Sequence, residues 1–194
     1  AAAAVTPVNL LSVALLSAPR QAMLENDLER QLQLYIDLLR EFPYSPDVSV
    51  AAADGASIIQ RGEQMGMLER RKHPLGDVLR MVEQNAVLAT YYRNNVLHLF
   101  ALPSLIACAF LNNPAMRHED IQRLVWRVYP YIRAELWLRW REEELPGVVD
   151  GVLASLAKKG LLERDADGSI WRRPTTGSAE AVRLSVLAQA TIQI

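Results

Sequence analysis

AMLENDLER at residues 22–30 and AMRHEDIQR at residues 115–123 are two similar stretches that decide how this chain is organised. A second pair follows in the same order, Gly-Met-Leu-Glu-Arg at 66–70 and Gly-Leu-Leu-Glu-Arg at 160–164. The first pair is offset by 93 residues and the second by 94. Two ordered matches at nearly equal spacing indicate an internal duplication. We therefore expect two units with like-ordered helices, in which Leu68 and Leu162 each face a core.

Each repeat lies among helix-forming patterns. In the first copy Leu28, Leu32, Tyr35 and Leu39 recur at the spacing of an amphipathic helix, and a similar set runs from Ile121 to Leu136 in the second. Apolar stretches precede both copies, and the longer one, 96–111, is interrupted by His98, Pro103 and Ser104. A membrane-spanning helix needs about 20 apolar residues, so a buried core helix is expected there instead.

The second unit closes on Asp167-Gly168, flanked by short alternating runs that predict a β-hairpin. Three helices followed by a hairpin are the outline of a winged helix. The predicted fold class is therefore mainly α, with tandem helical units and short β-hairpins, winged-helix-like. We expect a first unit over 1–95, a second with the terminal hairpin over 96–177, and a truncated further helix from 178 to 194.

Composition limits the function classes. The residues are 51% hydrophobic and 22% charged, which suits a packed core, and the formal net charge of −1 gives no electrostatic reason to expect nucleic acid as a partner. The single cysteine, Cys108, lies in an apolar run and is expected to pack as a small hydrophobic residue. Because His73, His98 and His118 are scattered, we expect no metal site and no cofactor.

Catalytic motifs are missing from the sequence. It contains no Cys-x-x-Cys, no glycine-rich nucleotide loop, no Gly-x-Ser-x-Gly and no His-Glu-x-x-His. A histidine oriented by an aspartate is an ordinary general base, and His73 and Asp77 offer that pair. Pro74 and Gly76 lie between them, however, so residues 73–77 are better interpreted as a solvated turn.

Residues 123–141 interleave arginine with tryptophan and tyrosine, which leaves three interpretations open. The aromatic rings could fill the core of one large helix while the arginines reach water. They could instead meet a membrane interface or a partner domain, or stack on single-stranded nucleic acid. We expect Trp126 and Trp140 to be mostly buried. Trp137, one helical turn from Arg133 and Arg141, is expected to be partly exposed at a contact surface.

Arg93 is the candidate for ligand binding. It follows two tyrosines and precedes Asn94 and Asn95, either of which is expected to cap a helix beginning at Val96. A fixed guanidinium in that place could pair with a carboxylate or a phosphate. The preceding stretch, 79–92, fits either strand or helix.

Several segments resemble the bacterial glycerol-3-phosphate acyltransferase family, in the region beyond its acyltransferase core. The most specific is QNAVLATYYRNNVLHLFALPSL at residues 84–105, and further matches are PYSP at 43–46, AELWLRW at 134–140 and ELP at 144–146. The resemblance covers nearly the whole chain. It implies an enzyme that transfers a fatty acyl group from acyl-carrier protein or coenzyme A to glycerol 3-phosphate.

The family's His-x-x-x-x-Asp motif, which supplies the catalytic base, is absent, and His73–Asp77 has one residue too few. The resemblance therefore predicts a non-catalytic C-terminal helical region, inactive by itself, with no catalytic residue. Its implied partners are the catalytic domain of the same enzyme, membrane lipid bound peripherally at the cytoplasmic side of the cell membrane, and a second copy as a homo-oligomer. The alternative is a winged-helix-like adaptor for nucleic acid or protein, although we expect no nucleic acid.

Overall fold

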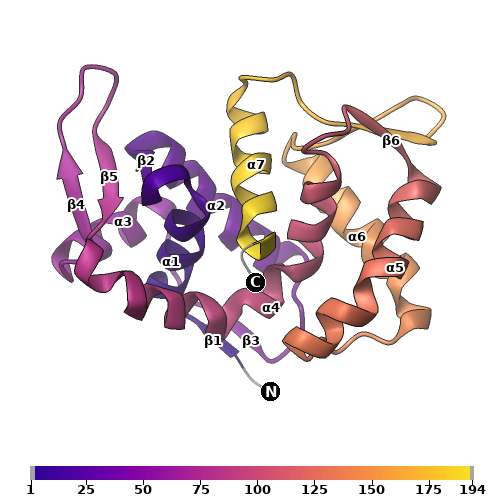
Figure 1. Ribbon diagram of the computed structural model, residues 1–194, viewed down its shortest axis with the longest axis horizontal. Coiled ribbons are helices and arrows are strands. Elements are labelled where there is room, and N and C mark those ends of the chain that lie inside the picture. Colours follow the sequence, from indigo (N-terminus) through magenta and orange to yellow (C-terminus); the bar gives the residue numbers. More distant parts are fainter. Residues whose placement is uncertain (1–2, 193–194) are drawn as a thin grey trace. The chain divides into compact units, whose positions relative to one another are not determined.

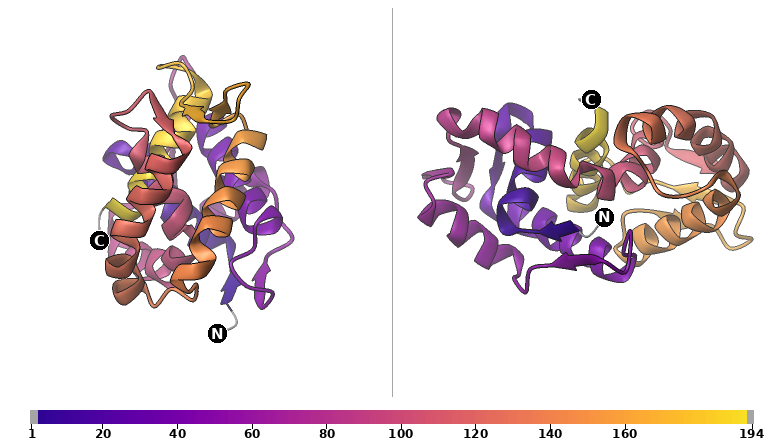
Figure 2. Two further views of the ribbon diagram at one scale, coloured as in Figure 1. Left: turned by 90° about the vertical axis from the view of Figure 1, so that its right-hand side faces the viewer. Right: turned by 90° about the horizontal axis from the view of Figure 1, so that it is seen from below.

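Helices dominate the computed structural model, which describes residues 3–192 (Figures 1 and 2). This confirms the mainly α prediction; the closer likeness to a winged helix stays a prediction. The chain divides into two compact units, Ala1–Leu97 and His98–Ile194. The first unit contains β1 Ala3–Val5, α1 Pro7–Ser17, η1 Pro19–Gln21, β2 Ala22–Leu24, α2 Glu25–Glu41, β3 Val48–Val50, α3 Gly55–Gln64, β4 Leu68–Arg71, β5 Val78–Met81 and η2 Glu83–Asn85.

Helix α4, Ala86–Ala109, begins in the first unit and ends in the second. The second unit continues with β6 Ala115–Arg117, α5 His118–Leu136, η3 Glu142–Glu144, α6 Leu145–Lys158, β7 Glu163–Arg164, β8 Ile170–Arg172 and α7 Ala179–Ile192. Among the described residues, no helix is both long enough and apolar enough to cross a membrane.

Helix α1 forms the centre of the first unit and is buried along almost its whole length. The Thr6 side chain accepts the Asn9 backbone N–H, and the Asn9 side chain accepts that of Thr6, so the first turn is capped reciprocally. Asn9 also donates from its Nδ2 to the Tyr92 carbonyl at 2.8 Å, which fixes the first half of α4 against α1.

The two units share one strand topology, which confirms the predicted duplication of structure. Each has a three-stranded sheet, ordered β2-β5-β4 in the first and β6-β8-β7 in the second. The registers agree as well, since Met23 pairs with Leu79 and Met116 pairs with Trp171 at the same place in each sheet. A short strand, two helices and a hairpin therefore recur in the same order.

The glycines of the second repeated motif end equivalent helices in the two units. Gly66 and Gly160 follow α3 and α6 with φ of 67° and 71°, a left-handed conformation that favours glycine at a helix end. The next N–H groups, of Met67 and Leu161, each donate at 2.9 Å to a carbonyl five residues earlier. Leu68 and Leu162 are then both buried, as predicted.

Three boundaries differ from expectation. The stretch 79–92, which fits either strand or helix by its sequence, contains both: strand β5 is followed by η2 and the start of α4. Helix α4 therefore begins at Ala86 rather than at Val96. Asn94 and Asn95 therefore lie inside α4 rather than at its start, since no glycine or proline lies between Ala86 and Val96 to delay helix formation. Helix α5 tolerates Pro130 but ends at Leu136, so the expected large helix does not reach Arg141.

Helix α7 packs on α4 within the second unit. The Ser104 hydroxyl donates to the Ala188 carbonyl at 3.1 Å and lies 2.6 Å from the Thr191 hydroxyl. Leu187 and Ala188 are fully buried at this contact. Residues 179–192 thus complete the core around the second half of α4.

Candidate contact surface

Helix α5 carries the aromatic and basic stretch, and it lies beside α6 (Figure 2). Its buried side is built from Ile121, Val125 and Tyr129, spaced four residues apart. Trp126 is one position round the helix from Val125, and half of it is exposed. The prediction that Trp126 is mostly buried was therefore wrong, because the narrow i, i+4 stripe leaves it at the margin of the core.

The end of α5 turns sharply at Trp137. This residue has φ 54° and ψ 44°, a left-handed conformation that is unusual for a bulky side chain, and it is 89% exposed. The turn allows Leu138 and Trp140 to be buried, and the buried Tyr129 hydroxyl donates to the Trp140 carbonyl at 2.8 Å. Core packing after the helix thus holds Trp137 out in solvent.

Arg133 and Arg141 end up in different surroundings. Arg133 lies in the last turn of α5, and its Nε donates to the Leu138 carbonyl at 3.3 Å. Arg141 lies outside the helix and precedes η3, where its backbone N–H donates to the Glu144 carboxylate at 2.7 Å. The expectation that Arg141 is one helical turn from Trp137 was wrong, because α5 has already ended.

We define the aromatic–basic surface as Trp126, Pro130, Arg133 and Trp137. The spacing of four and three residues places Trp126, Pro130 and Arg133 along one line of α5, and Trp137 follows directly after the end of the helix. All four are exposed. Next to Trp126 is a shallow cavity of about 250 Å³, which is also lined by Pro146 and Val149 of α6.

Arg93, the predicted ligand-binding candidate, lies inside α4 and is only 9% exposed. Its Nε and Nη2 donate to the Asn94 Oδ1 at 3.2 and 3.1 Å. Burial lowers the pKa of its guanidinium, which nevertheless stays charged. Among the described residues its hydrogen-bond partner is a neutral amide, so a ligand-binding role for Arg93 stays a prediction.

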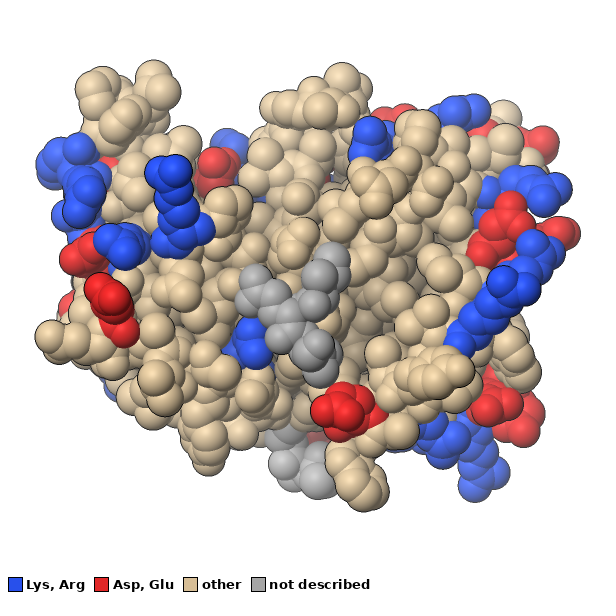
Figure 3. Space-filling view, viewed as in Figure 1, with Lys and Arg blue, Asp and Glu red and all other residues tan. Residues whose placement is uncertain are grey.

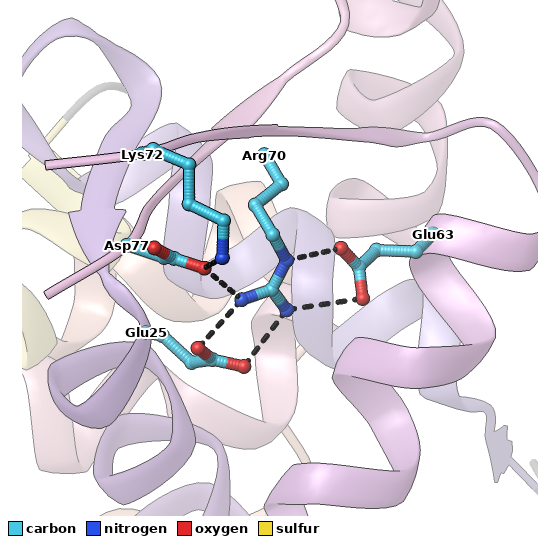
Figure 4. Close-up of polar contacts among 5 residues, drawn as sticks. All are labelled: Glu25, Glu63, Arg70, Lys72 and Asp77. Carbon is cyan, nitrogen blue, oxygen red and sulfur yellow. Dashed lines mark hydrogen bonds and ion pairs between the residues drawn. The ribbon is translucent and has the colours of Figure 1, made fainter.

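Figure 4 shows an ion cluster that the sequence analysis missed. Arg70 in β4 binds three carboxylates: Glu25 at 2.6 Å, Glu63 at 2.8 Å and Asp77 at 2.8 Å. Lys72 also binds Asp77 at 2.8 Å. Hydrogen bonds from Arg70 lower the pKa of Glu25, and those from Lys72 and then Arg70 lower that of Asp77. The cluster joins β4, the start of α2, the end of α3 and the hairpin loop.

This ion cluster separates the two members of the candidate general-base pair, His73 and Asp77. Asp77 is bound by Arg70 and Lys72, whereas the His73 Nδ1 accepts the backbone N–H of Leu75 at 3.2 Å. Among the described residues His73 therefore has no carboxylate to orient it, and the turn interpretation is supported.

Other groups with chemical potential are engaged in the second unit. The Cys108 thiol donates to the Ala188 carbonyl at 3.0 Å, and burial raises its pKa to about 11, which disfavours the reactive thiolate. His118 lies between the Asp150 carboxylate at 3.0 Å and the Trp171 indole N–H at 3.1 Å. Within residues 3–192, no three His, Cys, Asp or Glu side chains are grouped as metal ligands.

Comparison with known proteins agrees with the resemblance drawn from the sequence. The family model described as the glycerol-3-phosphate acyltransferase C-terminal region matches residues 1–194. Proteins named glycerol-3-phosphate acyltransferase from Pseudomonas paraeruginosa (strain DSM 24068 / PA7) and Pseudomonas aeruginosa (strain UCBPP-PA14) are 47% identical over 192 residues, and one from Pseudomonas putida (strain GB-1) is 45% identical. Each match covers 99% of this chain and 23% of the relative.

Proposed function

This chain belongs to the family of glycerol-3-phosphate acyltransferase C-terminal regions, and we propose from that premise that it is a non-catalytic contact region of such an enzyme. The parent enzyme would transfer a fatty acyl group to glycerol 3-phosphate in phospholipid synthesis. Acyl-carrier protein or acyl-coenzyme A would then meet the catalytic domain, which we expect in the part of the enzyme outside this chain. The present chain would serve that domain by holding it at the membrane.

The arrangement of polar groups supports a non-catalytic role. Acyl transfer to a hydroxyl needs a positioned base beside an anion-stabilising group. The only such histidine proposed from the sequence, His73, lies in an exposed turn away from any carboxylate partner in the described structure. We expect purified 1–194 to transfer no acyl group from acyl-coenzyme A to glycerol 3-phosphate. Turnover that is lost in His73→Ala would contradict this.

The observation that carries the contact role is the exposure of Trp137. The backbone of Trp137 is in a strained left-handed conformation, and its indole is held in water. The ring therefore exposes apolar area that an interface would bury. Trp126 and Arg133 are exposed on the helix that ends just before Trp137, and Arg133 lies between the two tryptophans in the sequence. Tryptophan rings settle at the headgroup level of a bilayer, and a guanidinium there pairs with phosphate. We therefore assign the aromatic–basic surface to the cytoplasmic face of the membrane, bound peripherally.

Co-sedimentation with vesicles of equimolar phosphatidylglycerol and phosphatidylcholine tests the assignment. Trp137→Ala should sediment less while its melting temperature stays that of the wild type. Tyr91→Ala is the matched control, because Tyr91 is an aromatic residue in α4 that is also mostly exposed. Wild-type binding by Trp137→Ala would reject the membrane assignment. Concentration-dependent self-association lost in Trp137→Ala would instead identify a second copy as the occupant.

Nucleic acid binding is the weaker alternative. In a winged-helix adaptor the third helix of each unit would need a clustered basic face. Helix α6 carries Asp150 and Lys158 as its only charges, and the glutamates of η3 precede it. We expect no salt-dependent binding of single-stranded DNA by this chain.

A further inference from the structure

The outer face of the first unit's sheet forms the floor of a cavity of about 680 Å³. Its walls are η1 and the turn from η2 into α4. Five charged residues line it: Arg20, Arg71, Arg80, Glu69 and Glu83. Figure 3 shows Lys and Arg side chains gathered over this end of the unit, with Asp and Glu beside them. The volume falls in the range of small-molecule sites, roughly 300–1,000 Å³.

Strand register explains how the arginines converge. Glu69 pairs with Arg80, and Arg71 pairs with Val78, so these side chains point to one face of the sheet. The alternate residues, including Leu79 and Met81, are buried in the core on the opposite face. Arg20 reaches the same cavity from η1, next to Ala22 at the edge strand.

Two of the three guanidinium groups lack an acidic partner. Arg80 lies 3.8 Å from Glu69, a long ion pair. Neither Arg20 nor Arg71 makes an ion pair with any residue in the described part of the chain. Arginine presents several N–H donors in a planar fork that matches a phosphate group. The cavity therefore offers free donors for an anion.

The second unit shows that the fold does not require these arginines. At the positions equivalent by the strand register and the 93-residue offset, Asp165 replaces Arg71 and Asn113 replaces Arg20, whereas Arg172 corresponds to Arg80. The sheet topology and register are nevertheless the same. Arg20 and Arg71 thus have a role that is particular to the first unit.

The backbone of η1, which forms one wall of the cavity, is also strained. Arg20 and Gln21 are consecutive non-glycine residues with φ of 55°, in the left-handed region. Such residues persist where the surrounding structure holds them, and they cluster at ligand sites. The second unit has no counterpart of η1, because Asn113 and Pro114 lead directly into β6.

We propose that this cavity binds a phosphate-bearing ligand through Arg20 and Arg71. Arg80 supplies a third donor, and Glu69 and Glu83 accept hydroxyl or ammonium groups of the same ligand. The phosphate belongs either to a lipid headgroup or to a soluble phosphorylated molecule. This site is separate from the aromatic–basic surface of the second unit and does not depend on its role.

Arg71→Asp tests the proposal, because it installs the residue that the second unit carries at this strand position. Arg172→Ala is the matched control, since it removes one exposed arginine from the corresponding face of the other sheet. Both are made in a Trp137→Ala background, so that vesicle binding by α5 is equal in all samples. Titration calorimetry with inorganic pyrophosphate measures the soluble arm. Co-sedimentation with vesicles of equimolar phosphatidylglycerol and phosphatidylcholine measures the lipid arm.

We expect Arg71→Asp to weaken binding about tenfold or more in one arm, while Arg172→Ala leaves it unchanged. Weaker binding of pyrophosphate by Arg71→Asp identifies a soluble ligand. Weaker binding of vesicles alone identifies a lipid headgroup. No binding in either arm, or equal loss in both variants, would overturn the proposal. Circular dichroism of each variant establishes that it is folded. If Arg71→Asp is unfolded, Arg71→Gln takes its place.

Discussion

Replacing Arg70 by methionine removes one cation from three carboxylates at once. Arg70 makes two-pronged contacts with Glu25, at 2.6 and 2.8 Å, and with Glu63, at 2.8 and 3.2 Å. A single contact joins it to Asp77. About a quarter of the Arg70 side chain is exposed, so water screens these pairs in part. Methionine keeps the length of the aliphatic stem, which limits the change to the charge and its hydrogen bonds.

The expected loss in the free energy of unfolding follows from the number of ion pairs that Arg70 makes. Partly exposed ion pairs each stabilise a protein by about 0.2–1 kcal/mol, so three pairs sharing one guanidinium give about 2 kcal/mol at neutral pH. For a chain of this size that loss lowers the melting temperature by roughly 4–8 °C.

The stability of Arg70→Met should depend less on pH than that of the wild type. In the wild type the pKa of Glu25 is below its ordinary value of 4.5, and the pKa of Asp77 is also lowered. These carboxylates therefore stabilise the folded state above their ordinary pKa values and lose that contribution as pH falls through the folded ones. Without Arg70, Glu25 loses the hydrogen bond that is the main cause of its lowered pKa, whereas Asp77 keeps its hydrogen bond from Lys72. Arg70→Met should therefore lose less stability than the wild type as pH falls.

Urea unfolding of both proteins at neutral pH and below the ordinary Glu pKa measures these effects. The gap between wild type and Arg70→Met should narrow in acid. Arg164→Met is the control, because Arg164 occupies the equivalent strand position but lies over the Trp171 ring, 5.1 Å from its centroid. That variant should lose about 0.5–1 kcal/mol with little pH dependence. A gap for Arg70→Met that is constant with pH would refute the ion-cluster reasoning.

Four further predictions concern single side chains. Trp140→Ala should lower the free energy of unfolding by about 3–5 kcal/mol because Trp140 is buried, whereas Trp137→Ala should change it by less than about 0.5 kcal/mol; urea unfolding of the pair measures both. Tyr129→Phe leaves the Trp140 carbonyl without its buried donor and should lose about 1–2 kcal/mol in the same assay. Cys108, with a pKa of about 11, should react with iodoacetamide roughly a hundredfold more slowly at neutral pH than a free thiol of pKa near 9, and labelling at the rate of free cysteine would contradict its engagement. Arg20→Gly should raise the melting temperature, because glycine relieves a left-handed conformation that costs about 1 kcal/mol, and a lower value would show that the residue is not strained.

The repeated framework was predictable because its determinants are local. Gly66 and Gly160 occupy left-handed helix ends, and the leucine two residues later enters the core in both units. Amphipathic spacing likewise placed the buried side of α2 and part of that of α5. Such features depend on residues within one or two helical turns of each other, which a sequence pattern records directly.

The candidate sites depended on contacts that no local pattern records. Helix α5 ends at Leu136 because Trp140 packs back under Tyr129, eleven residues earlier, and this displaces Arg141 from the surface predicted for it. The ion cluster brings Glu25 to Arg70 across 45 residues. Sequence spacing could have suggested only its nearer members, since Arg70 is seven residues from both Glu63 and Asp77.

Comparing the two units separates what the fold needs from what function added. Both retain the strand register, the glycine helix ends and the buried leucines, so these features suffice to build either unit. At equivalent strand positions, however, Arg70 gathers carboxylates, whereas Arg164 lies over an indole. Arg71 faces an open cavity where the second unit has Asp165. Because the framework accepts either residue, the charge of the first cavity and the exposed indole of the second unit are additions to the fold, and those are the places where a partner should be sought.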